Sequence, residues 1–151
     1  MKQILIALLL MAAPKTLAQD GSGEAMTEAH MMALVSEWTS MGNTLKTEAD
    51  IPAVLELLHP DFTYIHTEYD ANFDQEGLVA GLKGRLQRNW TKNEKRTITN
   101  RITGKNMVVI KFDSEWDDQR TGEWKHETAQ DHVTLFEFRA GKIWRITEFW
   151  E

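Results

Sequence analysis

The strongest constraint on the fold is the alternation of side chains near the end of the chain. Residues 132–150 read HVTLFEFRAGKIWRITEFW, in which two alternating segments flank a tight turn at Ala140-Gly141. Alternation with a period of two predicts two antiparallel strands joined as a hairpin. One face of this hairpin would carry the side chains of His132, Thr134, Phe136, Phe138, Trp144, Ile146, Glu148 and Trp150.

On this face we expect His132 to lie close to Glu148 across the two strands. A histidine and a glutamate among aromatic side chains lose free energy on burial unless they pair or face a wet cavity. The hairpin therefore predicts a pocket rather than an uninterrupted apolar core.

The rest of the chain shows helices first and strands later. Apolar residues at helical spacing predict helices over 25–46 and 75–90, and a short helix over 52–58 begins with Pro52. Strand patterns cover 61–67, 96–103, 107–116, 124–139 and 142–150, with a turn or short strand over 68–73 and loops over 90–95 and 117–123. Helices followed by an antiparallel meander predict an α+β fold, in which a curved sheet wraps around the helices.

The first eighteen residues have the pattern of a secretory signal peptide. Lys2 precedes an apolar run over 4–13, and Thr16-Leu17-Ala18 offers small residues where a signal peptidase cuts. We therefore predict removal of residues 1–18, a flexible N-terminus over 19–26, a single domain over 27–151 and a periplasmic or secreted location. The alternative is that the run forms an N-terminal helix of the fold; it is too short to span a membrane.

Composition narrows the range of partners. The chain of 151 residues has no cysteine, so no disulfide supports the fold. Removal of residues 1–18 takes away Lys2 and Lys15, which leaves 15 basic against 23 acidic residues and a net charge of −8. An acidic surface argues against nucleic acid and against an anionic membrane surface as partners. Six tryptophans indicate a large aromatic core, an apolar pocket, or both.

Two segments carry a resemblance to a known family. The order of elements, with DFTYIH at residues 61–66 after the second helix and GKIWRI at residues 141–146 near the end, resembles the SnoaL-like branch of the NTF2-like superfamily. The resemblance covers residues 27–151. It implies a cone, also known as a cystatin-like α+β barrel, formed by a curved mixed sheet around a long helix with a pocket at the open end. It also implies a homodimer.

Ketosteroid isomerases and limonene epoxide hydrolases share this cone, but their catalytic acids are replaced here. The resemblance places the proton-transferring aspartate of the isomerases at His66 and their protonated aspartate at Thr134, while their pocket tryptophan matches Trp150. No Asp-Arg-Asp set of the epoxide hydrolase kind is in register. The resemblance therefore implies the pocket but neither of these two activities.

Three titratable residues are the candidates for catalysis. His66 ends a strand beside Tyr64 and suits a base or proton shuttle, because histidine titrates near neutral pH. Glu148 would hold the ring of His132 in one tautomer. The alternatives are structural: His66 capping the rim of the sheet, and His132 with Glu148 forming a buried pair that satisfies itself.

Seven residues are expected to line the pocket: Trp38, Tyr64, Trp116, Thr134, Phe136, Ile146 and Trp150. For all of them except Tyr64, the alternative is simple core packing. Tyr64 and Thr134 would supply hydrogen bonds to a polar atom of the ligand. His126 with His66 and Glu148 would be the one metal set, but its ligands lack the clustered spacing of metal motifs, so we predict no metal and no other cofactor. The acidic residues Asp113, Glu115, Asp117 and Asp118 are expected on a solvated face.

These observations lead to two hypotheses for the function. The first is an exported pocket protein that acts on, or binds, a small hydrophobic molecule by cofactor-free acid–base chemistry of the isomerase, hydrolase or lyase type. The second is a non-enzymatic module that binds a small ligand or serves as an accessory dimerisation unit, with the same pocket and no chemistry.

Overall fold

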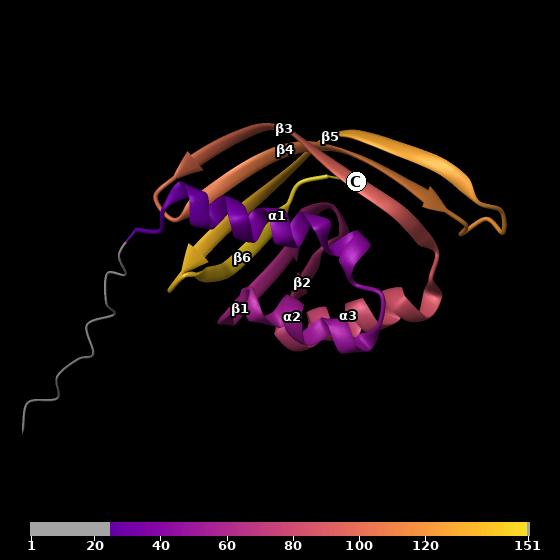
Figure 1. Cartoon of the computed structure of the whole chain (residues 1–151), viewed down its shortest axis with the longest axis horizontal. Helices are drawn as coiled ribbons and strands as arrows, with labels where there is room; N and C mark the ends of the chain where they lie inside the picture. The colour runs from indigo at the N-terminus through magenta and orange to yellow at the C-terminus, as the bar shows by residue number, and fades with distance from the viewer. Residues whose placement is uncertain (1–24, 151) are drawn as a thin grey trace, which may run out of the picture.

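The computed structural model describes residues 25–150, which form one curved six-stranded sheet with helices on its concave side (Figure 1). The helices are α1 (Glu28–Thr44), α2 (Ile51–Glu56) and α3 (Gln75–Arg88), with short 3-10 turns at Glu48–Asp50 and Thr67–Tyr69. The strands are β1 (Leu58–His66), β2 (Ala71–Phe73), β3 (Thr91–Gly104), β4 (Met107–Asp118), β5 (Lys125–Arg139) and β6 (Lys142–Glu148). The predicted α+β class is confirmed.

The strands lie in the order β2-β1-β6-β5-β4-β3. Only β1 and β6 run parallel, and the other neighbours are antiparallel. The pairing of β1 with β6 joins the first strand of residues 25–150 to the last, so the two segments that carry the resemblance lie side by side. Figure 1 shows α1 crossing beneath the arch of β3 to β6, with α2 and α3 on its other side.

The helix ends follow from capping chemistry. The Thr27 hydroxyl accepts the His30 N–H and starts α1, and the Asp74 carboxylate accepts the Gly77 N–H and starts α3. Asn89 ends α3 in the left-handed conformation, with φ of 46°.

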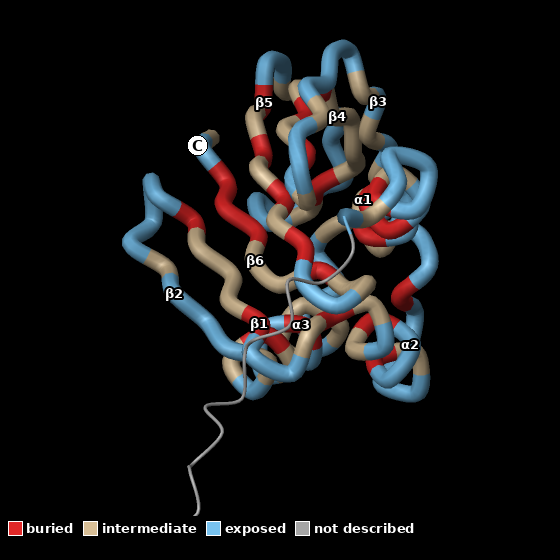
Figure 2. Tube along the Cα trace, turned by 90° about the vertical axis from the view of Figure 1, so that its left-hand side faces the viewer, coloured by how far each residue is buried: buried red, intermediate tan, exposed pale blue. Residues whose placement is uncertain are grey.

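The core lies between α1 and the concave face of the sheet. From α1 it takes Met31, Leu34, Val35 and Trp38, and the strands contribute Phe62, Val108, Ile110, Phe112, Phe136, Phe138, Ile143 and Ile146. Figure 2 shows buried residues recurring along β5 and β6, as expected for strands with one face toward a core.

A β-bulge in β6 changes which side chains face inward. Phe138 pairs with Ile143, but Glu137 pairs with Arg145, so Trp144 is the extra residue. Ile143 is fully buried, whereas the ring of Trp144 packs between the guanidinium groups of Arg139 and Arg145, each 4.3 Å from its centroid. The prediction that Trp144 shares a face with Ile146 was wrong, because the bulge shifts the alternation by one residue.

The predicted loop over 90–95 was also wrong. β3 begins at Thr91, which pairs with Asp118, and β4 extends to that residue. The segment is polar because β3 is an edge strand whose outer side chains, such as Lys92 and Lys95, are exposed. Its turn-like sequence reflects a register irregularity at Asn93, where φ is 54°.

The predicted leader over 1–18 and most of the segment over 19–26 lie outside the described residues. Across residues 25–150, no helix has the length and apolar character needed to cross a bilayer.

Candidate functional site

A buried glutamate lies at the centre of the cone, at the end of β6. Glu148 is 3% exposed, and its register partners are His66 on β1 and Thr134 on β5. The Tyr64 hydroxyl donates a hydrogen bond to Glu148 Oε2, and the Nε2 atom of His66 lies 3.7 Å from the same oxygen. Glu148 Oε1 makes no hydrogen bond to any described residue, so one carboxylate oxygen stays available to a ligand.

Burial sets the protonation of this group. Burial raises the pKa of Glu148 above its usual value, opposed by the hydrogen bond from Tyr64 and by the charge of Arg96. Burial, and then the nearby charge of Glu148, raises the pKa of Tyr64, so its hydroxyl remains protonated. The site therefore holds a carboxylate of increased basicity oriented by a neutral phenol.

His66 is a neutral neighbour of this carboxylate. Burial lowers its pKa, with the charge of Glu68 acting in the opposite direction. Neither ring nitrogen has a hydrogen-bond partner among the described residues, and both are buried. The ring packs at 4.4 Å from that of Tyr69 and at 4.7 Å, edge-on, from that of Trp150. Burying an imidazole without a hydrogen-bond partner costs free energy. Such groups are uncommon in folded proteins and indicate a role for the side chain.

His132 does not pair with Glu148, in contrast to the prediction. The bulge at Trp144 places Thr134 opposite Glu148, and the ring of His132 stacks on that of Trp150, with centroids 4.4 Å apart and planes 1° apart. Burial, followed by the charge of Arg96, lowers the pKa of His132. Its Nδ1 atom is buried without a partner in residues 25–150.

An ion-pair chain that we did not predict lies across the cone. Glu94 accepts from Arg85 of α3 at 2.7 Å and from Arg96 of β3 at 2.8 Å, one guanidinium on each oxygen. α1 holds Glu94 from the other side: Asn43 donates to its backbone oxygen, and a Cβ on Gly42 would collide with its carboxylate. The signal in the sequence was the alternation of Glu94, Arg96 and Ile98, part of which falls in the segment predicted as a loop.

Two cavities meet at Arg96 and Trp150. The Glu148 cavity, of about 220 Å³, is lined by Trp38, Met41, Tyr64, Phe73, Gly77, Leu78, Gly81, Leu82, Arg85, Arg96, Glu148 and Trp150. The His132 cavity, of about 250 Å³, is lined by Tyr69, Thr91, Glu94, Arg96, Phe112, Ser114, Trp116, Arg120, His132 and Trp150. Arg96 and Trp150 are thus the residues common to both linings.

The predicted pocket residues fall into two groups. Trp38, Tyr64, Trp116 and Trp150 line one or both of these cavities. Phe136 and Ile146 lie in the hydrophobic core and line neither cavity. Thr134 also lines neither; it is buried beside Glu148, and its hydroxyl has no hydrogen-bond partner among the described residues.

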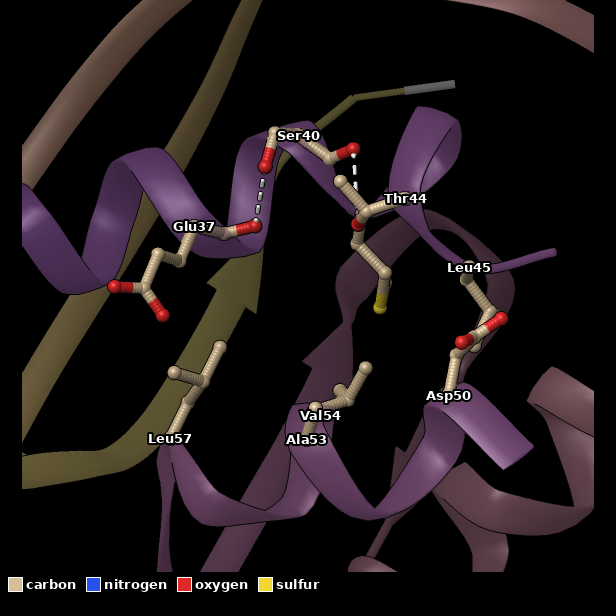
Figure 3. A pocket seen from close by; sticks show the side chains of 9 residues that line it. Glu37, Ser40, Thr44, Leu45, Asp50, Ala53, Val54 and Leu57 are labelled. Atoms are coloured by element: carbon tan, nitrogen blue, oxygen red, sulfur yellow. Dashed lines mark hydrogen bonds between the residues drawn. The ribbon is translucent and has the colours of Figure 1, made fainter. Parts of the chain in front are cut away.

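A third cavity lies on the other side of α1, between α1 and α2 (Figure 3). It has a volume of about 310 Å³ and an apolar floor that includes Leu45, Val54 and Leu57. Its carboxylate at Asp50 already accepts the backbone N–H groups of Lys46 and Thr47. This groove thus offers no polar group comparable with the unpartnered imidazoles around Trp150.

The described residues contain no cluster of three side chains suited to hold a metal ion. His126, the third member of the metal set considered from the sequence, is exposed and contacts Asp117 at 3.2 Å.

No family model matches the chain, and no curated protein matches it in sequence. Solved structures match its fold. A protein classed as a SnoaL-like polyketide cyclase from Shewanella putrefaciens CN-32 has a TM-score of 0.64 at 9% identity, over 82% of this chain and 90% of that one. An NTF2-like protein of unknown function from Burkholderia pseudomallei K96243 has a TM-score of 0.60 at 14% identity, over 83% and 92%.

A third neighbour, from Catenulispora acidiphila DSM 44928, has a ketosteroid isomerase-like fold and was solved in complex with trimethylamine. Its TM-score is 0.58 at 16% identity, over 78% of this chain and 85% of that one. The chain therefore has the NTF2-like cone fold, of the SnoaL-like and ketosteroid isomerase-like kind. The resemblance predicted from residues 61–66 and 141–146 is confirmed at the level of the fold.

Proposed function

We propose that this protein binds a small organic molecule in the Glu148 cavity and transfers a proton to or from it, with Glu148 as the base. The observation that carries the proposal is a buried carboxylate at the cavity wall, held by Tyr64 and with one oxygen unpartnered among the described residues. Buried carboxylates with a raised pKa are typical of sites for general acid–base catalysis.

Each of the three polar groups has a role in this proposal. Tyr64 donates to Oε2 and fixes the carboxylate plane, which leaves Oε1 to accept the proton. Neutral His66 lies 3.7 Å from Oε2 and is the second titratable group beside the carboxylate. Trp38 and Trp150 form an apolar part of the cavity wall, and burial of Glu148 raises its pKa and so strengthens the base.

The structural neighbours support the choice of a small molecule as ligand. The neighbour from Catenulispora acidiphila holds trimethylamine, and the one from Shewanella putrefaciens is classed as a polyketide cyclase. Since fold alone does not determine chemistry, the proposal depends on Glu148 and its neighbours.

Proton abstraction is testable without knowledge of the natural substrate. Nitrobenzisoxazole loses its ring C–H proton to a base while its N–O bond breaks, and the product is a coloured cyanonitrophenolate. We expect the wild-type protein to accelerate this elimination, with a rate that rises with pH through the raised pKa of Glu148. Glu148→Gln should abolish the acceleration.

Glu127→Gln, at an exposed carboxylate of β5, is the control and should retain the acceleration. Equal rates for wild type and Glu148→Gln would rule out Glu148 as the base.

A second candidate function is ligand binding without chemistry. It is favoured by the hydrogen bond from Tyr64, which already stabilises the carboxylate within the fold. A protein that binds the probe without turning it over would support this alternative.

We also propose that the protein is exported after loss of residues 1–18 and that it forms a homodimer. The apolar run near the N-terminus and the resemblance to the NTF2-like fold support these proposals. Native mass spectrometry of the protein from its exported fraction should give a subunit that begins at Gln19 and an assembly of two subunits. A full-length subunit or a monomer would contradict export processing or dimerisation, respectively.

A further inference from the structure

Arginines gather in the lining of the two cavities of this acidic chain. Arg85, Arg96 and Arg120 line the cavities with Glu94 and Glu148, in a chain with a net charge of −6. Arg85 pairs with Glu94, and Arg120 pairs with Asp118, both at 2.7 Å. Arginine side chains supply charge-assisted hydrogen-bond donors for an anion.

Arg96 is placed to supply such donors. It lies in the wall shared by both cavities, and only its Nε atom is engaged, by Glu94 at 2.8 Å. Its two terminal nitrogens have no hydrogen-bond partner within residues 25–150. A guanidinium with free terminal donors matches the two oxygens of a carboxylate. Gly42 and Asn43 hold Glu94 in place, so Arg96 is fixed before a ligand arrives.

The aromatic walls do not favour a cationic ligand. Aromatic faces attract cations, and Phe112 and Trp116 line the His132 cavity with Trp150. However, the guanidinium of Arg96 lies 5.3 Å from the centroid of Phe112 and takes that position itself. An amine at that face would meet the charge of Arg96.

We propose that the two cavities together bind a small organic anion, a carboxylate on a flat apolar body, with Arg96 as its anchor. The apolar body would lie against Trp150, and the anchored carboxylate would bring the adjoining carbon toward Glu148. This proposal rests on the proposed function above and names the class of its substrate. It commits to an anion, in contrast to the amine bound by the neighbour from Catenulispora acidiphila.

Three probes of similar shape and different charge test the proposal: phenylacetate, phenylacetamide and phenethylamine. We expect calorimetry at neutral pH to show the anion binding about tenfold more tightly than the neutral amide, the gain of one charge-assisted hydrogen bond. The amine should bind most weakly. Arg96→Gln should remove the preference for the anion, and Arg96→Lys should keep part of it, because lysine retains the charge without the planar fork.

Arg101→Gln is the matched control, because Arg101 lies on the same strand, lines neither cavity and pairs on the surface with Glu28. It should leave the preference unchanged. An amide or amine that binds as tightly as the anion would overturn the anion proposal and leave the pocket intact. Wild-type protein that binds none of the three probes would overturn the ligand pocket itself, and the anion proposal with it.

Discussion

Replacing Glu148 by Gln is expected to stabilise the folded protein at neutral pH while it removes proton transfer. Burial raises the pKa of Glu148, so the ionised form is less favourable in the folded state than in the unfolded chain. Glutamine keeps an oxygen that accepts from Tyr64 but carries no charge. The loss of a general base should lower the rate with the elimination probe by about 10²–10⁴-fold. Sites built for activity often oppose stability in this way.

The pH dependence of stability tests this account. A pKa that is higher in the folded state means that the folded state binds the proton more tightly, so protonation of Glu148 favours folding at acidic pH. This contribution is lost as the pH rises through the folded-state pKa. The advantage of Glu148→Gln in urea denaturation should therefore be largest near pH 8 and shrink toward pH 4.5.

The stability of wild type has to be compared with that of Glu148→Gln at each pH, because His66 and His132 change the stability with pH in the opposite direction. Burial lowers the pKa values of His66 and His132, so acid below the usual value of 6.5 favours the unfolded chain at these positions. Both histidines are present in wild type and variant, so their contribution cancels in the difference. A variant less stable than wild type across the whole pH range would mean that the carboxylate contributes more through Tyr64 than its burial costs.

Trp38→Ala is expected to lower the free energy of unfolding by about 3–5 kcal/mol, as for other large aromatic side chains removed from a core. Trp38 is 3% exposed, and its ring lies 6.2 Å from that of Phe62 and 6.4 Å from that of Tyr64. It joins α1 to β1 and also lines the Glu148 cavity. Its removal would leave a void that the sheet cannot fill.

Trp90→Ala provides the matched control for this prediction. Trp90 is 45% exposed and contacts the guanidinium of Arg88 at 5.3 Å. Its loss should cost less than about 1 kcal/mol, the range of an exposed cation–π contact. Urea denaturation followed by circular dichroism measures both variants. Similar losses for the two tryptophans would contradict the assignment of Trp38 to the core.

The fold was predictable because its signals are local. Alternation along β4 and β5, the caps at Thr27 and Asp74, and the turn at Ala140-Gly141 are all set by neighbours in the sequence. The burial of Glu148 was predictable for the same reason, since it lies two residues after Ile146, on the same face of β6.

The details of the site were not predictable, because they depend on contacts between distant segments. A single extra residue, Trp144, moves the partner of Glu148 on β5 from Val133 to Thr134, and no residue type marks that bulge. The chain from Arg85 through Glu94 to Arg96 forms only when α3, β3 and α1 come together. The polar residues at the start of edge strand β3 have the composition of a loop, so the sequence predicted a loop over 90–95.

The two edges of the sheet have a consequence for behaviour at high concentration. A free edge offers unpaired backbone groups to other chains, and proteins limit this with short strands, irregular register and charge. Here β2 spans only three residues, and β3 carries two register irregularities together with Lys92, Lys95 and Arg101. Strand addition from another chain is thus disfavoured at both edges. This protects a chain without disulfides from fibril-like aggregation, and it confines any stable self-association to the faces of the sheet and to the helices.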